Sequence, residues 1–532
     1  MQDGTARSRS ASDGAATPSS GPVHPQMWAV NLVSDPIHGY IELTKRLTPD
    51  RARRLGLAQE AAAEGDLLDS AWLQRMRRIS QLQSARWVFP TAEHSRFTHS
   101  LGVMHEAGLW ARHLYPSLIR ALASVEPAAV EPASVQPAAV QPAAVESAAV
   151  ESAAVESAAV ESAAVESAAS LPSEGLVVET LRLAGLLHDV GHGPFAHFFD
   201  EHVLCQFRAP VDPRRTHKSL THEDLSQLIV ERELGETIRA IRRAPGAVPG
   251  RDALRSDESI DPRWLSFLIS KPPLADPSMP RWLRLLQPLL SGVFTVDNLD
   301  YVRRDAYLTG VSAGPVDVER LRRYSFVGPG GLSLYEPGLS ALEMFLTARL
   351  FMYQQVYFHR SVRAIDLDMA EVFRPSIEAI FGDGSPADDL GHYADLDEYA
   401  LLHQAALWAR GEALSDRPVP GDGTVTSDVG RAWQAILLRR PRWRAETEVR
   451  RAYEAGERAA VQAEVKAALG PEVPGRVTAD LAEIDARPAQ ATATDSLLAV
   501  VGRDGAPAAP LSASLARLPA YALVARRYRR AE

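Results

Sequence analysis

An apolar helical segment that ends in a run of histidines constrains this chain more than any other feature. Residues 176–187 carry apolar side chains at helical spacing, and His188, Asp189, His192 and His197 follow within ten residues. Imidazole and carboxylate groups suit divalent ions such as Mn, Fe, Zn, Ni or Mg. Adjacent helical residues point roughly 100° apart, so His188 and Asp189 can share one ion only with ligands from other elements. We therefore expect such ligands elsewhere in the chain.

Composition and charge limit the class of protein. The 532 residues suffice for two or three domains, or for one large core with additions. The net charge of −10 argues against a nucleic-acid partner. A single cysteine, Cys205, excludes an internal disulfide and fits a reducing cytoplasm. Because no run approaches the ~18 apolar residues of a membrane span, we expect a cytoplasmic protein without a membrane partner.

Composition also divides the chain into five segments. Residues 1–26 have the composition of a disordered tail, and 27–123 and 171–379 contain the motifs and most of the helical periodicity. Between them, 124–170 is a low-complexity pentapeptide repeat with a valine at every fifth position, which we interpret as an inserted spacer. A docking segment for a partner is the alternative. Residues 380–532 carry helical patterns and Pro/Gly breaks without a motif of known chemistry.

The fold class predicted from periodicity is mainly α. Apolar residues at helical spacing predict helices over 72–83, 97–118, 176–187, 282–287, 342–362 and 449–469. Strand signals are few: a turn at 35–39 within 30–43, and a glycine-rich turn within 326–335, each typical of a β-hairpin. We therefore predict a helical core with small hairpins and a helical C-terminal region.

Two other segments contain side chains that suit a metal or phosphate site. Arg96 lies three residues before His99 and thus on roughly the same helix face. An arginine beside a metal-binding histidine suits a phosphate, whose oxygens the ion and the guanidinium can share. His222 is followed by Glu223, which can orient the imidazole and raise its basicity. The alternative is an exposed helix start capped by Thr221.

A third segment, 297–305, places Asp297, Asp300, Tyr301 and Asp305 at three- and four-residue steps along one presumed helix. One carboxylate here can close a metal shell, while a phenol and a second carboxylate can bind sugar hydroxyls. The alternative is a surface helix with ion pairs along its length.

Together these segments resemble the HD-domain phosphohydrolases, and within them the deoxynucleoside triphosphate triphosphohydrolases, the group that contains the animal SAM-and-HD-domain enzyme. The resemblance runs from about residue 33 to 365, so the HD domain would comprise 27–123 and 171–379. Removing the 47 residues of the repeat shortens the interval from His99 to His188 from 89 to 42 residues, which is compatible with an insertion in a loop. Further matching motifs lie at 35–39, 74–82 and 357–360.

The resemblance implies a cofactor and a reaction. The ion would be held by His99, His188, Asp189 and Asp297, and the sequence leaves open whether it is Mn, Mg, Fe, Zn or Ni. The substrate would be a deoxynucleoside triphosphate (dNTP), hydrolysed at the α-phosphorus to a deoxynucleoside and triphosphate.

Catalytic roles are implied for five residues. His192, His222 and Glu223 would lie near the attacking water, and His197, backed by Asp200, would protonate the departing 5′ oxygen.

Substrate-binding roles are implied for a larger set. Arg96 would grip the α-phosphate. The others would be Gln81 and Leu82 against the sugar, Tyr301 and Asp305 at the 3′-hydroxyl, Tyr357 where a ribose 2′-hydroxyl would clash, and Arg304, Arg349, His359 and Arg360 at the phosphate tail. Asn298 and Tyr353 stand where the animal relative has a lysine and a histidine near the phosphates, so base and phosphate preference can differ.

A regulatory site is implied as well. Asp69, Gln74 and Arg77 match positions of a guanine-nucleotide activator site in the animal relative, and such a site would imply assembly into a homo-oligomer. The alternative is that these residues have no regulatory role and form salt bridges at a helix end.

Three alternatives remain open from sequence. The chain could be another HD enzyme, although the Gly-Tyr-Pro signature of cyclic-dinucleotide hydrolases and the Glu-Asp pair of guanosine-tetraphosphate hydrolases are absent. It could be a nucleotide-sensing protein that binds a dNTP without turnover. Binding or cleavage of single-stranded nucleic acid is disfavoured by the acidic charge balance.

Overall fold

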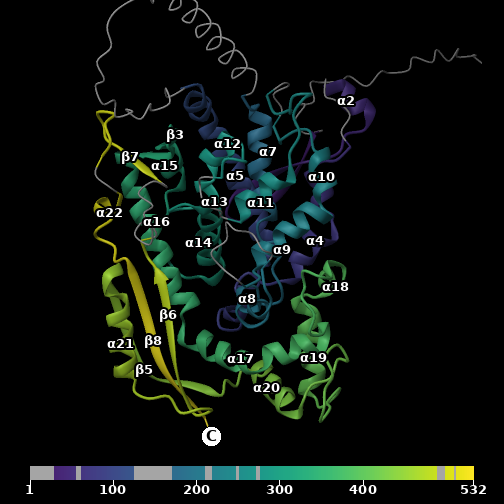
Figure 1. Cartoon of the computed structure of the whole chain (residues 1–532), viewed down its shortest axis with the longest axis vertical. Helices are drawn as coiled ribbons and strands as arrows, with labels where there is room; N and C mark the ends of the chain where they lie inside the picture. The colour runs from purple at the N-terminus through teal and green to yellow at the C-terminus, as the bar shows by residue number, and fades with distance from the viewer. Residues whose placement is uncertain are drawn as a thin grey trace, which may run out of the picture.

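The computed structural model describes residues 29–55, 61–124, 171–209, 219–246, 251–270, 276–487, 498–508 and 511–531. The predictions for the tail and for all but the first residue of the repeat therefore lie outside the described residues. Within the described part the chain is mainly helical with three small sheets, which confirms the predicted class (Figure 1). No helix in this part is long and apolar enough to cross a membrane.

The elements of the first half are largely helical. In order they are β1 (Val30–Asp35), β2 (Gly39–Thr44), α2 (Pro49–Leu55), α3 (Glu64–Leu68), α4 (Ala71–Arg75), η1 (Met76–Arg78), η2 (Gln83–Trp87), α5 (Arg96–Ala123), α7 (Glu174–Leu187), α8 (His197–His202), η3 (Leu204–Gln206), α9 (His222–Leu228), η4 (Ile229–Glu233), α10 (Gly235–Ala240), α11 (Pro262–Ile269), α12 (Arg281–Leu286), α13 (Pro288–Ser291) and α14 (Val296–Thr309).

The second half mixes helices with short sheets. Its elements are α15 (Val318–Arg323), β3 (Ser325–Gly328), β4 (Gly331–Tyr335), η5 (Glu336–Gly338), α16 (Leu339–Met352), η6 (Tyr353–Tyr357), α17 (Arg360–Phe381), α18 (Leu390–Asp395), α19 (Glu398–Ala409), α20 (Ser427–Leu437), β5 (Trp443–Tyr453), η7 (Ala455–Glu457), α21 (Arg458–Leu469), β6 (Val477–Asp485), β7 (Ala499–Val501), α22 (Leu511–Ser514) and β8 (Tyr521–Arg530).

The centre of the core is the antiparallel pair α5 and α7. Every residue of α7 is buried, which explains its nearly continuous apolar sequence. Gly185 of α7 lies so close to α5 that a Cβ there would stand 3.0 Å from the carbonyl oxygen of Val103. Helix α14 packs on the other side of α5. The first turns of α5 and α14 and the end of α7 thereby meet at one place.

Both predicted hairpins form. Strands β1 and β2 pair antiparallel from Val30 with Thr44 to Asp35 with Gly39, and Gly39 adopts the positive φ that this turn requires. Strands β3 and β4 pair antiparallel, and β7 adds to β4 in parallel.

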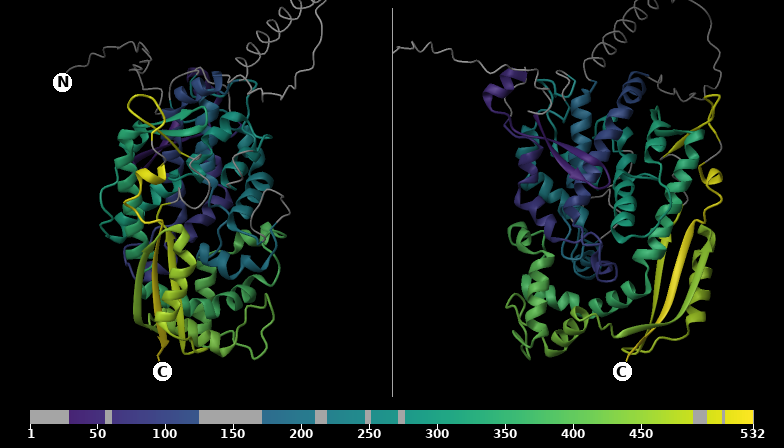
Figure 2. Two further views of the ribbon diagram at one scale, coloured as in Figure 1. Left: turned by 60° about the vertical axis from the view of Figure 1, so that its left-hand side comes forward. Right: turned by 180° about the vertical axis from the view of Figure 1, so that it is seen from behind.

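The C-terminal region departs from the helical prediction. Helices α18, α19 and α20 are present, but β5, β8 and β6 then form an antiparallel sheet covered by α21. The helix predicted over 449–469 was wrong in its first part, where β5 continues to Tyr453. Most of β5 is exposed, so it lacks the alternation that marks a strand, and its partner β8 follows about 70 residues later. Figure 2 shows α17 running between this sheet and the α18–α20 group.

Candidate active site and metal centre

The structure brings the four predicted metal ligands together. His99 stands in the first turn of α5, His188 and Asp189 follow α7, and Asp297 stands in the first turn of α14. Asp297 Oδ1 lies 3.1 Å from His99 Nε2 and 3.7 Å from His188 Nε2. Asp189 reaches the same centre, with Oδ1 3.3 Å from His188 Nε2 and Oδ2 3.8 Å from His99 Nε2.

This centre has the donor set for a divalent ion. His188 Nδ1 donates to the carbonyl of Gly185 at 2.8 Å, which leaves Nε2 buried without a hydrogen bond and facing the carboxylates. Burial favours the neutral acids, but the imidazoles of His188 and His99 hold the pKa of Asp297 well below its usual range, and His188 and Arg96 do the same for Asp189. His99, His188 and Asp189 could hold such an ion together. Asp297 Oδ1 lies beside both imidazoles and could add a second carboxylate.

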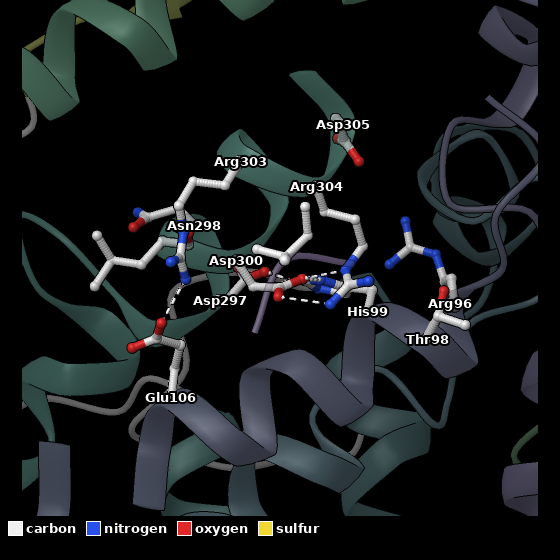
Figure 3. A network of polar contacts seen from close by, with 12 residues as sticks. Arg96, Thr98, His99, Glu106, Asp297, Asn298, Asp300, Arg303, Arg304 and Asp305 are labelled. Carbon is white, nitrogen blue, oxygen red and sulfur yellow. Dashed lines mark hydrogen bonds and ion pairs between the residues drawn. The ribbon is translucent and has the colours of Figure 1, made fainter. Parts of the chain in front are cut away.

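A buried carboxylate on α14 orients His99 from behind. His99 Nδ1 donates to Asp300 Oδ2 at 2.8 Å, and Asp300 also accepts from His38 Nε2 at 2.6 Å. Arg304 completes the set through Nε at 2.8 Å from Asp300 Oδ2 (Figure 3). Arg304 also donates to Asp35 Oδ2 at 2.8 Å. A carboxylate behind a metal-binding imidazole fixes its tautomer and ring orientation.

This network is tight and strongly charged. Asp300 is fully buried, and its partners hold its pKa well below the usual range against the effect of burial. Burial opposes charging of His99, but Asp297 and Asp300 outweigh it and raise the pKa of His99 to about 10. Gly102 permits this packing, because a Cβ there would lie 2.0 Å from Asp300 Oδ1.

A second cluster lies beside the first. Asp200 Oδ2 accepts from His222 Nδ1 at 2.5 Å and lies 3.4 Å from His197 Nδ1. Glu223 Oε2 stands 3.4 Å from the same nitrogen of His222. The ring of His192 stacks on that of His222 with centroids 3.7 Å apart, and its Nε2 is 3.4 Å from Asp189 Oδ1.

The histidines of the second cluster differ in charge. Burial disfavours the imidazolium of His222, but Asp200 and Glu223 outweigh it and raise its pKa to about 9, so His222 is cationic at neutral pH. Burial and the nearby charges of Arg96 and His222 hold the pKa of His192 well below its usual value, so that ring is neutral.

A cavity of about 370 Å³ opens onto both clusters. Its volume falls in the range of small-molecule sites. The predicted site residues in its lining are Gln81, Arg96, His99, His188, Asp189, His197, His222, Glu223, Asp297, Tyr301 and Arg349. Asn298 and Tyr353 also line it, as does Asp485 at the end of β6.

Comparison with known families agrees with this geometry. Residues 157–264 match the family described as HD domain, and residues 316–415 match its HD associated region. The chain therefore contains an HD domain followed by an HD associated region.

Relatives of this HD-domain protein include proteins named deoxynucleoside triphosphate triphosphohydrolases. It is 26% identical over 405 residues to the uncharacterized protein YwfO of Bacillus subtilis, covering 72% of this chain and 68% of YwfO. It is 24% identical over 345 residues to the deoxynucleoside triphosphate triphosphohydrolase SAMHD1 homolog of Dictyostelium discoideum, and 23% identical over 360 residues to SAMHD1 of Bos taurus. These alignments cover 64% and 65% of this chain, and about half of each of the two enzymes (48% and 47%).

Solved structures share the fold. A hypothetical protein from Aquifex aeolicus has a TM-score of 0.58 at 23% identity, covering 94% of this chain and 96% of its own. A phosphohydrolase from Bacteroides thetaiotaomicron has a TM-score of 0.55 at 19% identity, covering 94% and 100%.

Some predicted residues of this HD-domain protein lie behind the cavity. Arg304 was predicted at the phosphate tail. In the structure its guanidinium is buried between Asp300 and Asp35, behind the candidate ligands, and does not line the cavity. Asp305 is also outside the lining and bonds Tyr357 Oη at 2.5 Å and His94 Nε2 at 2.8 Å.

Six more predicted residues lie outside the lining, among them Asp200, which bonds His222, and Tyr357, which bonds Asp305. His192 is fully buried beneath His222, and Leu82 is buried in the core. His359 is committed to the start of α17, where its Nδ1 accepts from the N–H of Ser361. Arg360 is exposed on the first turn of that helix. The structure thus gives the last two no contact with the cavity.

The residues of the implied activator site lie together, apart from the cavity. Gln74 Nε2 donates to the carbonyl of Leu68 at 2.7 Å, and Gln74 Oε1 accepts from Arg77 Nε at 2.9 Å. The Arg77 guanidinium also covers the ring of Phe97. Asp69 is exposed at the end of α3.

The sequence analysis missed three functional features. Asp300 was named only as part of a helical series, although its spacing from Asp297 and the motif at 35–39 were signals of a buried network. Arg96 was predicted to grip a phosphate, and in the structure it also forms an ion pair with Asp189. Asp485 carried no signal, because only the fold of the C-terminal sheet brings it to the cavity.

Proposed function

We propose that the protein hydrolyses deoxynucleoside triphosphates at the α-phosphorus and releases a deoxynucleoside and triphosphate. The observation that carries the proposal is a single cavity whose lining contains the four metal-ligand candidates, Arg96, His197 and Arg349. Similarity to enzymes named deoxynucleoside triphosphate triphosphohydrolases supports the choice of substrate.

The cavity has the charges that this reaction needs. A divalent ion held by the four candidate ligands would lower the pKa of bound water and polarise a phosphoryl oxygen. Arg96 and the cationic His222 line the same cavity and stabilise negative charge on the α-phosphate as the bond to the sugar lengthens.

Residues of the second cluster transfer the protons during hydrolysis. As the oxygen of water bonds to the α-phosphorus, Glu223 accepts one of its protons. The bond from phosphorus to O5′ breaks, and its electron pair leaves on O5′, which takes a proton from His197. Asp200, 3.4 Å from His197 Nδ1, orients that ring so that its other nitrogen serves as the acid. Such acid catalysis contributes roughly 10²–10⁴-fold to the rate.

The opposite wall of the cavity would hold the sugar and the outer phosphates. Arg349 Nε lies 3.2 Å from Tyr301 Oη, and its Nη1 donates to the carbonyl of Asp485 at 2.9 Å, so the guanidinium is held at the wall. We assign Arg349 to the phosphate tail and Tyr301 to the 3′-hydroxyl. Asp305 and Tyr357, which bond each other, would set the limit against a 2′-hydroxyl from behind this wall.

Regulation and assembly are part of the same proposal. Asp69, Gln74 and Arg77 would bind a guanine-nucleotide activator, and binding there would accompany formation of a homo-oligomer. A cytoplasmic location fits a substrate from the nucleotide pool.

The test is product analysis with each of the four dNTPs in the presence of Mn²⁺ or Mg²⁺. Equal amounts of deoxynucleoside and triphosphate support the proposal, whereas deoxynucleoside monophosphate with pyrophosphate places the cleavage at another bond. Binding of a dNTP without any product favours the nucleotide-sensing alternative.

Three variants separate ion binding from proton transfer. Asp189→Ala should lose the ion together with activity, because it removes a carboxylate from the centre. His197→Ala should keep the ion and lose turnover. His403→Ala, which alters an exposed histidine on α19, is the matched control and should retain both.

A further inference from the structure

The corner between α18 and α19 contacts the loop that contains His192 and leads to His197. This corner, residues 393–398, lies in the HD associated region, far along the chain from loop 191–196. Tyr393 Oη donates to the carbonyl of Gly191 at 2.8 Å. Arg75 links the two segments, because Nη1 donates to the carbonyl of His192 at 2.7 Å and Nη2 to that of Leu396 at 2.6 Å.

Glu398 contacts the loop at Phe195, two residues before His197. Its carboxylate is fully buried, and Oε2 accepts the backbone N–H groups of both Phe195 and Ser80 at 3.2 Å. Arg86 Nη1 lies 2.9 Å from Oε1 and balances its charge. Ser80 precedes Gln81, which lines the cavity, so one side chain fixes two segments of the site.

Loop 191–196 depends on these hydrogen bonds because its backbone is strained. Phe195 and Ala196, immediately before His197, have φ values of +57° and +50°. Residues with a Cβ rarely adopt this left-handed region, and two in succession persist only where the surroundings impose them. The strained pair directs the chain into α8, whose first residue is His197. A relaxed pair would turn His197 away from Asp200.

We propose that Glu398 is a positioning residue for His197: through the N–H of Phe195 it holds the left-handed turn that places the imidazole beside Asp200 and in the cavity. This inference deepens the proposed function and rests on it for the kinetic test, but the position of the loop can be measured without a substrate. It gives the HD associated region a part in positioning a proposed catalytic side chain.

The structural test is hydrogen exchange of the full-length protein, followed in peptides that span 190–199. Glu398→Gln should speed exchange of the Phe195 amide by about tenfold or more, because the amide has only one acceptor oxygen. If that oxygen faces the N–H groups of Phe195 and Ser80, the amide NH2 is turned toward the Arg86 guanidinium, and if it faces Arg86 the two N–H groups lose their acceptor. Tyr393→Phe, which removes a hydrogen bond to the same loop with little change in volume, should loosen the loop in the same direction. The matched control is Asp368→Asn, another fully buried carboxylate, which bonds Arg442 and should leave this peptide unchanged. Unchanged exchange in Glu398→Gln overturns the inference whatever the substrate is.

The kinetic test is a double-mutant cycle on dNTP hydrolysis. Glu398→Gln alone should lower kcat by roughly 10–10²-fold, as displacement of a catalytic group by about 1 Å does, with KM and bound metal unchanged. In the His197→Ala background the same substitution should change kcat by less than about threefold, because its effect passes through the missing imidazole. An equal loss in both backgrounds shows a general structural defect and overturns the positioning role. Altered exchange in a protein that hydrolyses no dNTP leaves the loop contact standing and refutes the proposed function instead.

Discussion

Substitution of Gly102 by alanine should damage the metal centre without touching a ligand. An added Cβ would stand 2.0 Å from Asp300 Oδ1 and 2.4 Å from Arg304 Nη2. The first separation is about 1.4 Å shorter than the 3.4 Å at which ordinary contact begins. Neither group can yield locally, because both are buried and bonded to each other, to His99 and to Asp35. Helix α14 must therefore move away from α5.

The size of the effect follows from what that movement breaks. A shift of about 1 Å stretches the 2.8 Å bond from His99 Nδ1 to Asp300 and also moves Asp297, which stands on the same helix. Loss of a partner that orients a metal ligand costs about 10–100-fold in metal affinity. Overpacking adds about 1–3 kcal/mol of destabilisation.

The assay is Mn²⁺ titration of chelator-treated protein by equilibrium dialysis, with far-ultraviolet circular dichroism as the check on folding. The control is Ser100→Ala on the same turn of α5, since Ser100 is buried and its hydroxyl makes no hydrogen bond. It should bind Mn²⁺ as the natural protein does. If folded Gly102→Ala binds Mn²⁺ with unchanged affinity, then Asp300 does not orient His99 in the way described.

Three further outcomes follow from the structure. Burial raises the pKa of Asp366 to about 6, so the folded state binds more protons than the unfolded state between about pH 4 and 6. The contribution of the protonated Asp366 carboxyl to the free energy of unfolding is complete below about pH 4 and is lost as pH rises through 6. Asp366→Asn should therefore raise the free energy of unfolding at pH 7 by up to about 3 kcal/mol. Urea titrations should show that the difference between the variant and the natural protein vanishes near pH 4. Arg349→Gln should raise KM for a dNTP by roughly 10–100-fold, since a bond to a charged group contributes about 1.5–3 kcal/mol, and an unchanged KM in steady-state assays would place the phosphates elsewhere. Removal of metal by chelation should lower Tm in a calorimetric scan, and added Mn²⁺ should restore it. The reason is that a ligand present at 100 times its Kd stabilises the native state by about 2.7 kcal/mol. A Tm that chelation leaves unchanged would contradict an ion held in the folded state.

Sequence patterns predicted the helical core and named the four ligand candidates that the structure brings together, because both predictions depend on local spacing. The apolar run before His188 forms α7, and the turn motifs at 35–39 and 328–331 form hairpins. The ligand candidates come from three segments, yet each carried a polar motif at the start or end of a helix, where a side chain can leave the apolar face.

Roles that depend on distant partners were not predictable. Arg304 looked like a free cation on a helix, but its partner Asp35 lies 269 positions away, and the close approach at Gly102 turns both it and Asp300 inward. Glu398 stands in a region without motifs, and its contact with Phe195 spans 203 positions. In β5 the pattern indicates charge and exposure but not which strand will pair with it.

The lining of the cavity runs from Gln81 to Asp485. Every candidate ion ligand lies at or before position 297, yet the wall formed by Arg349 and Asp485 is completed only when β6 joins β8. The residues that could bind an ion are thus translated well before those that close the cavity. Under the proposed function, fragments cut before β5 would be expected to bind the ion without turnover.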